Sequence, residues 1–229
     1  MKPRADVSPR VLLTGFGPFP GVAVNASARL VERLAEAAGR MSTGPRITVA
    51  VLPTEWVRGP ETLDAIWDDV QPDIAIHFGV SDRAPGFVVE TTAHNQCHAQ
   101  ADACGALPDP DRDTRSGLQS RMASLPVSSI LLRLAGRGIA CCSSTDAGAY
   151  LCNAILFRSI VRAQTVQRRV LCGFIHIPSA LAGGGPDGED SLAGCPLTWD
   201  SALAGGQEII NASCADFGAP RRGPRAGLA

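Results

Sequence analysis

The chain has 229 residues, of which 45% are hydrophobic and 19% charged, and its formal net charge is −1. This length suits one domain with a sizeable core, so we predict a single domain over 1–216 and a disordered Gly-, Pro- and Arg-rich tail over 217–229. The low net charge gives no indication of a nucleic-acid partner or an anionic membrane. No apolar run approaches the ~20 residues of a membrane span, and no signal-peptide core follows the N-terminus, so we expect a cytoplasmic protein.

Short apolar runs alternate with amphipathic stretches along the chain. Apolar, β-branched runs predict strands, and helical spacing predicts helices, as where Ser27 is a candidate N-cap and Leu30 and Leu34 share a face. Between them, Gln96–Ser116 is rich in Ala, Asp and Pro and is predicted to be irregular. In chain order, the predicted strands are 11–14, 47–52, 73–78, 86–92, 139–143 and 170–177, and the predicted helices are 27–38, 61–70, 127–135, 149–163 and 199–212.

This alternation is typical of the α/β class. We predict a single three-layer α/β/α domain with a mostly parallel twisted sheet covered on both faces. Functional sites in such folds gather at the carboxyl ends of the strands. The residues that follow strands are therefore the first candidates for a site.

Cys152 is the first candidate. It lies in the segment SSTDAGAYLCN, where a strand leads through a glycine-containing loop into a predicted helix. A thiol in the first helical turn experiences the positive end of the helix dipole, which favours the nucleophilic thiolate. The alternative is a small buried hydrophobe, since free cysteines are often buried. The chain has eight cysteines, and its length and the lack of a signal favour free thiols over disulfides.

His176 and Glu90 each lie in an apolar strand. His176, in GFIHIPS, precedes the carboxyl end of its strand and is placed to exchange a proton with a nucleophile; the alternative is a core histidine with satisfied ring nitrogens. Glu90, in FVVETTAHN, needs a partner if it is buried, and orienting an imidazole would supply one. The alternative for Glu90 is an edge strand that turns the carboxylate to water.

The loop after the first strand, TGFGPFPGVAVNAS, contains three glycines. Their G-x-G-x-x-x-G spacing differs from the dinucleotide-binding pattern, and a P-loop lysine is missing. Phe16 and Phe19 place two aromatic rings at a carboxyl strand end, where they suit a small apolar pocket or, alternatively, the core. Cys141 and Cys142 occupy a predicted strand, point to opposite faces, and are expected to pack in the core.

A competing set of candidates is His94, Cys97, His98 and Cys104, which are zinc-capable residue types close in sequence. Their spacing matches no standard zinc module. A zinc-dependent hydrolase stays open as an alternative on these residues.

Four of these segments resemble motifs of the pyroglutamyl-peptidase (pyrrolidone-carboxylate peptidase) family of cysteine peptidases. TGFGPFPGVAVNAS is similar to the family's TGF-x-PF-G and N-x-S, and the segment ending in ETTAHN is similar to its E-x-x-A-x-N. SSTDAGAYLCN is similar to S-x-x-A-G-x-Y-x-C-N, and FIHIP is similar to F-x-H-x-P. The four matches occur in the family's order and span Thr14–Ser179.

The resemblance implies a Cys-His-Glu triad in which Cys152 is the nucleophile, His176 the general base and acid, and Glu90 the residue that orients His176. It implies that Phe16 and Phe19 hold the pyroglutamyl ring of N-terminally pyroglutamylated peptides, that no metal or organic cofactor is needed, and that the chain forms a homo-oligomer.

The chain departs from the family pattern at several positions. Val80 stands where many bacterial relatives have a glutamine that contacts the lactam, although animal relatives read similarly to this chain. Thr91 follows the glutamate where the family usually has a basic residue. Gln96–Arg115 and the Cys- and Gly-rich segment after Pro178 match poorly. A catalytically weakened relative that binds peptide ends or a partner is therefore a further alternative.

Overall fold

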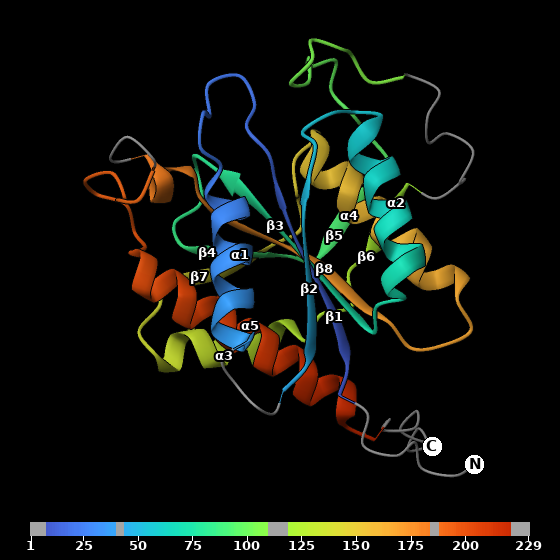
Figure 1. Cartoon of the computed structure of the whole chain (residues 1–229), viewed down its shortest axis with the longest axis vertical. Helices are drawn as coiled ribbons and strands as arrows, with labels where there is room; N and C mark the ends of the chain where they lie inside the picture. Colours follow the sequence, from blue (N-terminus) through green and yellow to red (C-terminus); the bar gives the residue numbers. More distant parts are fainter. Residues whose placement is uncertain (1–7, 40–43, 110–118, 184–187, 221–229) are drawn as a thin grey trace, which may run out of the picture.

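The computed structural model describes residues 8–39, 44–109, 119–183 and 188–220. A six-stranded sheet lies between two layers of helices (Figure 1), which confirms the predicted α/β/α class. The strands of this sheet are β1 (Arg10–Phe16), β2 (Arg46–Leu52), β3 (Ile74–Ser81), β4 (Phe87–Glu90), β7 (Cys141–Ser144) and β8 (Leu171–Pro178). The helices are α1 (Ala26–Gly39), α2 (Arg58–Val70), α3 (Val127–Gly136), α4 (Leu151–Thr165) and α5 (Trp199–Gly218), with a short 3-10 turn, η2 (Ser179–Ala182).

The sheet has the order β2-β1-β3-β8-β4-β7 and is mostly parallel. β2, β1, β3 and β8 run in one direction, whereas β4 pairs antiparallel with β8 and is parallel to β7. The chain leaves β1 toward β2 on one side and reaches β3 on the other, so a topological switch point lies between β1 and β3. Ligands in open α/β sheets bind in the crevice at such a point.

The core consists of two apolar layers, one on each face of the sheet. Alternate residues of β1 point to opposite faces, with Val11 and Leu13 in one layer and Leu12 in the other. The first layer packs against α1, α3 and α5, and the second against α2 and α4 (Figure 1). Because both faces are covered, the central strands are apolar throughout, and this is the pattern that made them recognisable in the sequence.

Ion pairs link α2 to α4, which packs on the sheet through its buried residues. Arg158 Nε lies 3.1 Å from Asp64 Oδ1, and Arg162 contacts both Asp64 and Asp68. These contacts matter for the site because α4 carries Cys152 in its first turn.

Several details differ from the sequence predictions. Asn25, rather than Ser27, caps α1: its Oδ1 accepts a hydrogen bond from Ser27 N (3.1 Å), while the Ser27 hydroxyl accepts one from Phe16 N (3.0 Å). A small antiparallel sheet of β5 (Thr92–His94) and β6 (Ser120–Met122) was not predicted. Helix α5 continues through residue 218, past the predicted start of the tail, and residues 221–229 lie outside the described residues.

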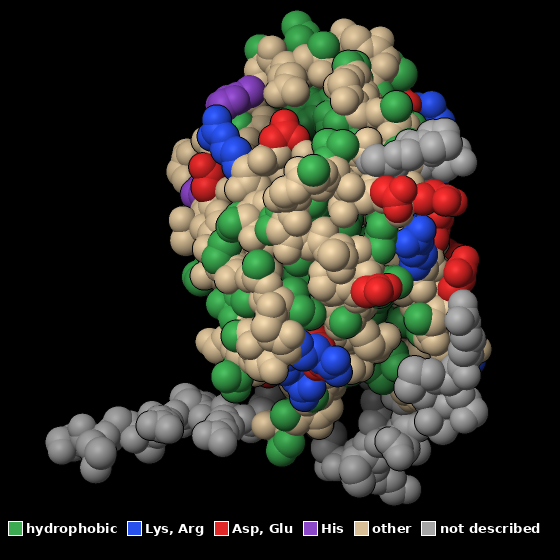
Figure 2. Space-filling model, turned by 90° about the vertical axis from the view of Figure 1, so that its left-hand side faces the viewer, with side chains coloured by type: hydrophobic (Ala, Val, Ile, Leu, Met, Phe, Trp, Pro, Cys, Tyr) green, Lys and Arg blue, Asp and Glu red, His purple; other side chains and the backbone are tan. Residues whose placement is uncertain are grey.

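The face of the molecule drawn in Figure 2 carries no dominant charge. It mixes apolar, neutral and charged side chains, with acidic groups gathered toward its right-hand edge. Among the described residues, no helix has the length and apolarity needed to cross a lipid bilayer.

Candidate active site

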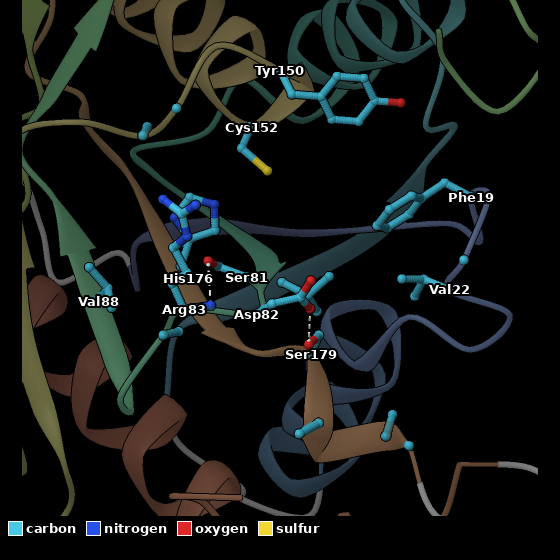
Figure 3. Close-up of a pocket in the computed structure, with 18 of the residues that line it drawn as sticks. Phe19, Val22, Ser81, Asp82, Arg83, Val88, Tyr150, Cys152, His176 and Ser179 are labelled. Atoms are coloured by element: carbon cyan, nitrogen blue, oxygen red, sulfur yellow. Dashed lines mark hydrogen bonds between the residues drawn. The ribbon is translucent and has the colours of Figure 1, made fainter. Parts of the chain in front are cut away.

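A cavity of about 1000 Å³ opens between the loops that follow β1, β3 and β8 (Figure 3). This is the end of the sheet where the switch point lies, as expected for the fold. Cys152, His176 and Glu90 all line the cavity, so the structure brings the three proposed triad residues together.

Cys152 is the second residue of α4 and half-buried. Its sulfur points into the cavity toward His176 (Figure 3). Gly79 makes room for it, because a Cβ added there would lie 3.1 Å from the Cys152 sulfur and 2.6 Å from Phe174 Cζ. The position at the helix start agrees with the sequence prediction and exposes the sulfur to the positive end of the helix dipole.

His176 is nearly buried, with 8% of its surface exposed, and its ring packs at 4.8 Å between centroids on Phe174. Burial alone would lower the pKa of His176. The charge and hydrogen bond of the neighbouring Cys152 sulfur, together with those of Glu90, outweigh burial and raise this pKa to about 10. These two neighbours therefore favour the protonated imidazole.

Glu90 is 2% exposed, and its Oε1 lies 2.8 Å from His176 Nδ1. Of the two alternatives for Glu90, the structure shows the buried one. Val88, not Glu90, pairs directly with His176 across β4 and β8, so the carboxylate reaches the ring from a diagonal position. Because Glu90 engages Nδ1, the other ring nitrogen is left to face Cys152.

An aromatic wall bounds the cavity on the side of the β1 loop. Phe19 lines the cavity and lies 6.5 Å from the Tyr150 ring, which in turn stands edge-on to Trp56 at 5.2 Å. Phe16 is 3% exposed and packs on Phe174 in the core, 6.2 Å between ring centroids. Phe19 thus lines the pocket. Phe16 instead packs in the core, which the sequence analysis gave as the alternative to a pocket.

Sequence reasoning assigned no role to Tyr150 or Asn153, which flank Cys152. Buried Asn153 binds three backbone groups: its Nδ2 donates to His94 O (2.7 Å) and Gln96 O (3.0 Å), and its Oδ1 accepts from His94 N (2.8 Å). It therefore ties the start of α4 to the strand that follows Glu90. The only signal in the sequence was its place directly after Cys152.

The excursion after β5 is irregular in its described part, as predicted, and Asp102 organises it. Burial alone would raise the pKa of Asp102, but hydrogen bonds from backbone N–H groups, among them those of Trp56, Ala106 and Cys104, lower it. This fold of the excursion brings Gln100 to the cavity wall.

The zinc alternative gains no support from the arrangement of its residues. His94 Nε2 lies 2.9 Å from Thr145 O, and Cys97 and Cys104 are exposed. Within the described ranges, no three His, Cys, Asp or Glu side chains are grouped so that they would hold a metal ion.

The structure also places Val80, Thr91, Cys141 and Cys142, which the sequence analysis singled out, and His77, which it did not. Val80 and Cys142 line the cavity, so the expectation of core packing was wrong for Cys142, while Cys141 packs against the core. Thr91 donates from Oγ1 to Ser144 O (2.9 Å) and so ties β4 to β7. His77, by contrast, is a core histidine held between two hydroxyls, and burial lowers its pKa to about 3.

Comparisons with known proteins show what the chain is similar to. The family model described as pyroglutamyl peptidase matches residues 9–184. A pyrrolidone-carboxylate peptidase of Pyrococcus furiosus is 30% identical over 170 residues, covering 74% of this chain and 80% of the relative. One of Chromobacterium violaceum is 32% identical, covering 73% and 77%. The crystal structure of pyroglutamyl peptidase I from Bacillus amyloliquefaciens is 26% identical with a TM-score of 0.78, covering 92% of this chain and 98% of that one.

Proposed function

The chain belongs to the pyroglutamyl peptidase family, a family of cysteine peptidases, and on this premise we propose that it hydrolyses the amide bond after an N-terminal pyroglutamyl residue. We further propose that Cys152 is the nucleophile, His176 the general acid and base, and Glu90 the residue that orients His176. The substrates would be peptides whose N-terminal residue has cyclised to a lactam.

In the first step, the Cys152 thiolate attacks the pyroglutamyl carbonyl carbon and forms a tetrahedral intermediate. The Cys152 sulfur lies at the start of α4 and beside His176, where a negative charge on the nucleophile is stabilised. Backbone N–H groups in the first turn of α4 are unpaired within the helix and are candidates to stabilise the oxyanion. Collapse of the intermediate breaks the amide bond, and His176 gives its proton to the leaving amine, so that a thioester remains.

In the second step, water hydrolyses the thioester. Neutral His176 takes a proton from the attacking water, and the Cys152 thiolate leaves as the free pyroglutamate forms. Glu90 holds His176 through Nδ1 in both steps. All proton transfers in this scheme use side chains of the chain itself and water.

Substrate selection follows from the aromatic wall. A pyroglutamyl ring is small, flat and uncharged, so the ring of Phe19 and the neighbouring Tyr150 suit it. An ordinary N-terminus carries an α-ammonium group, which would lose its hydration against these rings without gaining a partner. We propose that Phe16 contributes indirectly: it packs on Phe174, and Phe174 packs on the ring of His176.

The observation that carries the proposal is the buried contact of 2.8 Å between Glu90 and His176, with the Cys152 sulfur on the other side of the same imidazole. A core histidine would need neither a buried carboxylate nor a thiol at a helix start. The three groups together provide a nucleophile, a proton carrier and an orienting group.

The test is hydrolysis of a fluorogenic pyroglutamyl amide by wild type and by Cys152→Ser, in reductant, with and without chelator. We expect chelator-resistant activity that disappears in the variant. Cys142→Ser, which changes the other thiol of the cavity wall, is the matched control and should keep its turnover. Folded wild type that leaves the substrate intact would refute the proposed substrate class, and activity lost to chelator would favour the zinc alternative.

A further inference from the structure

The loop between β3 and β4 crosses the carboxyl end of β8. Ser81 at the end of β3 pairs with Pro178, and Val88 in β4 pairs with His176 on the other side of β8. Residues 82–86 must therefore pass over the end of β8, directly beyond His176. Arg83 lies in this crossing and lines the cavity.

The crossing is a tight turn that fixes the backbone of Arg83. Ser81 Oγ accepts a hydrogen bond from Arg83 N (3.3 Å), and Ser81 O accepts one from Ala84 N (3.2 Å). The neighbouring Asp82 carboxylate is engaged by the hydroxyl of Ser179. The Asp82 side chain is thus bound to Ser179, whereas only the backbone of Arg83 is held by the turn.

Arg83 is the only Arg or Lys among the described residues that line the cavity. Its side chain is exposed, and within the described part of the chain its guanidinium forms no ion pair. Each of the other charged groups of the wall has a partner within the chain: Glu90 contacts His176, Asp82 contacts Ser179, and Asp146 accepts a hydrogen bond from Gly148 N at 2.9 Å. The cavity therefore offers a bound molecule one uncommitted cation.

The direction of the substrate follows from the proposed chemistry. The acyl group lies against Phe19 and Tyr150, and His176 must reach the leaving amine. The leaving peptide then extends past His176, away from the aromatic wall. Figure 3 shows Arg83 and Val88 on that side of the cavity, with Phe19 opposite.

We propose that Arg83 binds a carboxylate on the residue that follows the pyroglutamyl group. This inference rests on the proposed function and specifies its substrates. The carboxylate has two possible sources, the C-terminus of a pyroglutamyl dipeptide or an acidic side chain in a longer peptide. In either case the planar guanidinium would accommodate both oxygens, which a lysine would not do.

The test compares kcat/KM within two matched pairs of substrates. Pyroglutamyl-alanine against its amide isolates the C-terminal carboxylate, and pyroglutamyl-glutamate amide against pyroglutamyl-glutamine amide isolates an acidic side chain. Both ratios are measured for wild type, Arg83→Gln and Arg46→Gln. Arg46 is an exposed arginine at the start of β2, the end of the sheet away from the cavity, so it controls for loss of a positive charge.

We expect Arg83→Gln to lower the charged-to-neutral ratio of at least one pair by about three- to tenfold, mainly through KM, as suits a partly solvated ion pair. The pair that responds identifies the source of the carboxylate. Arg46→Gln should keep the wild-type ratios, and 0.5 M salt should reduce the difference. Taking a ratio within each variant cancels any general loss of activity.

Two results would overturn the inference, and they are distinguishable. If wild type cleaves all four substrates and Arg83→Gln leaves both ratios at their wild-type values, Arg83 does not bind a carboxylate and the proposed function stands. If folded wild type cleaves none of the four, the proposed function fails and this inference fails with it.

Discussion

The contact between Glu90 and His176 gives the sharpest prediction for the proposed mechanism. Glu90→Gln removes one negative charge, while the amide oxygen retains the shape and an acceptor for His176 Nδ1. A carboxylate and an imidazolium with charge centres roughly 4 Å apart attract each other by about 4 kcal/mol at an effective dielectric constant of 20. Losing half to all of this stabilisation lowers kcat by about 30- to 1,000-fold, because each 1.36 kcal/mol is worth about a factor of ten.

The same change should alter the pH dependence. The pKa of His176 is raised to about 10, above its ordinary value of 6.5, so the stability contributed by the cation is fully present below pH 6.5 and is lost as pH rises through about 10. Without the Glu90 charge the pKa of His176 falls toward its ordinary value. The alkaline limb of kcat/KM and the alkaline loss of thermal stability should both move to lower pH.

The assay is a pH series of kcat/KM and of melting temperature for wild type, Glu90→Gln and Asp73→Asn. Asp73 is also buried and bound by arginines, to Arg10 at 3.2 Å and Arg168 at 3.0 Å, but it precedes β3 at the opposite end of the sheet. Asp73→Asn should lower the melting temperature and leave the alkaline limb in place. A Glu90→Gln enzyme with wild-type kcat and an unmoved alkaline limb would refute the orienting role.

Four further substitutions test the surroundings of the triad. Gly79→Ala should reduce kcat by at least about tenfold, because the added methyl group clashes with the Phe174 ring beneath His176 and crowds the Cys152 sulfur; unchanged single-turnover rates would contradict this. Phe16→Ala should destabilise the protein by about 3–5 kcal/mol in urea titrations, whereas Phe19→Ala should mainly raise KM and change stability far less. Equal effects of the two would remove the distinction between core and pocket. Asn153→Ala should lower the free energy of unfolding by about 1–3 kcal/mol and increase hydrogen exchange of the His94 backbone N–H. Unaltered exchange would show that the Asn153 hydrogen bonds to the backbone are dispensable.

The sequence was sufficient for the strands and helices that form the core. Strands such as β1 and β8 are buried on both faces and give continuous apolar runs, and α1 shows its buried stripe at helical spacing. Strands β5 and β6 were missed because each has three residues and they pair across a long, irregular stretch. Such short non-local pairs leave no periodic pattern in the sequence.

The proposed triad could be located from the sequence because each residue is unusual for its position. His176 and Glu90 are ionisable groups in apolar strands, and Cys152 follows a strand at a helix start. Their roles stay predictions until the variants are measured. The aromatic wall was only half foreseen, since Tyr150 meets Trp56 through tertiary packing that no local pattern records.

The direction of β4 was the feature least accessible from the sequence, and it decides what Glu90 does. In a fully parallel sheet, the carboxyl end of β4 would lie level with the end of β8, and Glu90 would stand at the mouth of the cavity in contact with water. Because β4 is reversed, Glu90 lies opposite Phe174, two residues below His176, while Val88 takes the place beside the histidine. The carboxylate is therefore dry, and a charge in such an environment stabilises an imidazolium far more than one in water. Because β4 is reversed, the rule that sites lie at the carboxyl ends of strands could not point to Glu90. The only indication that Glu90 has a partner was its place as an ionisable residue in an apolar strand.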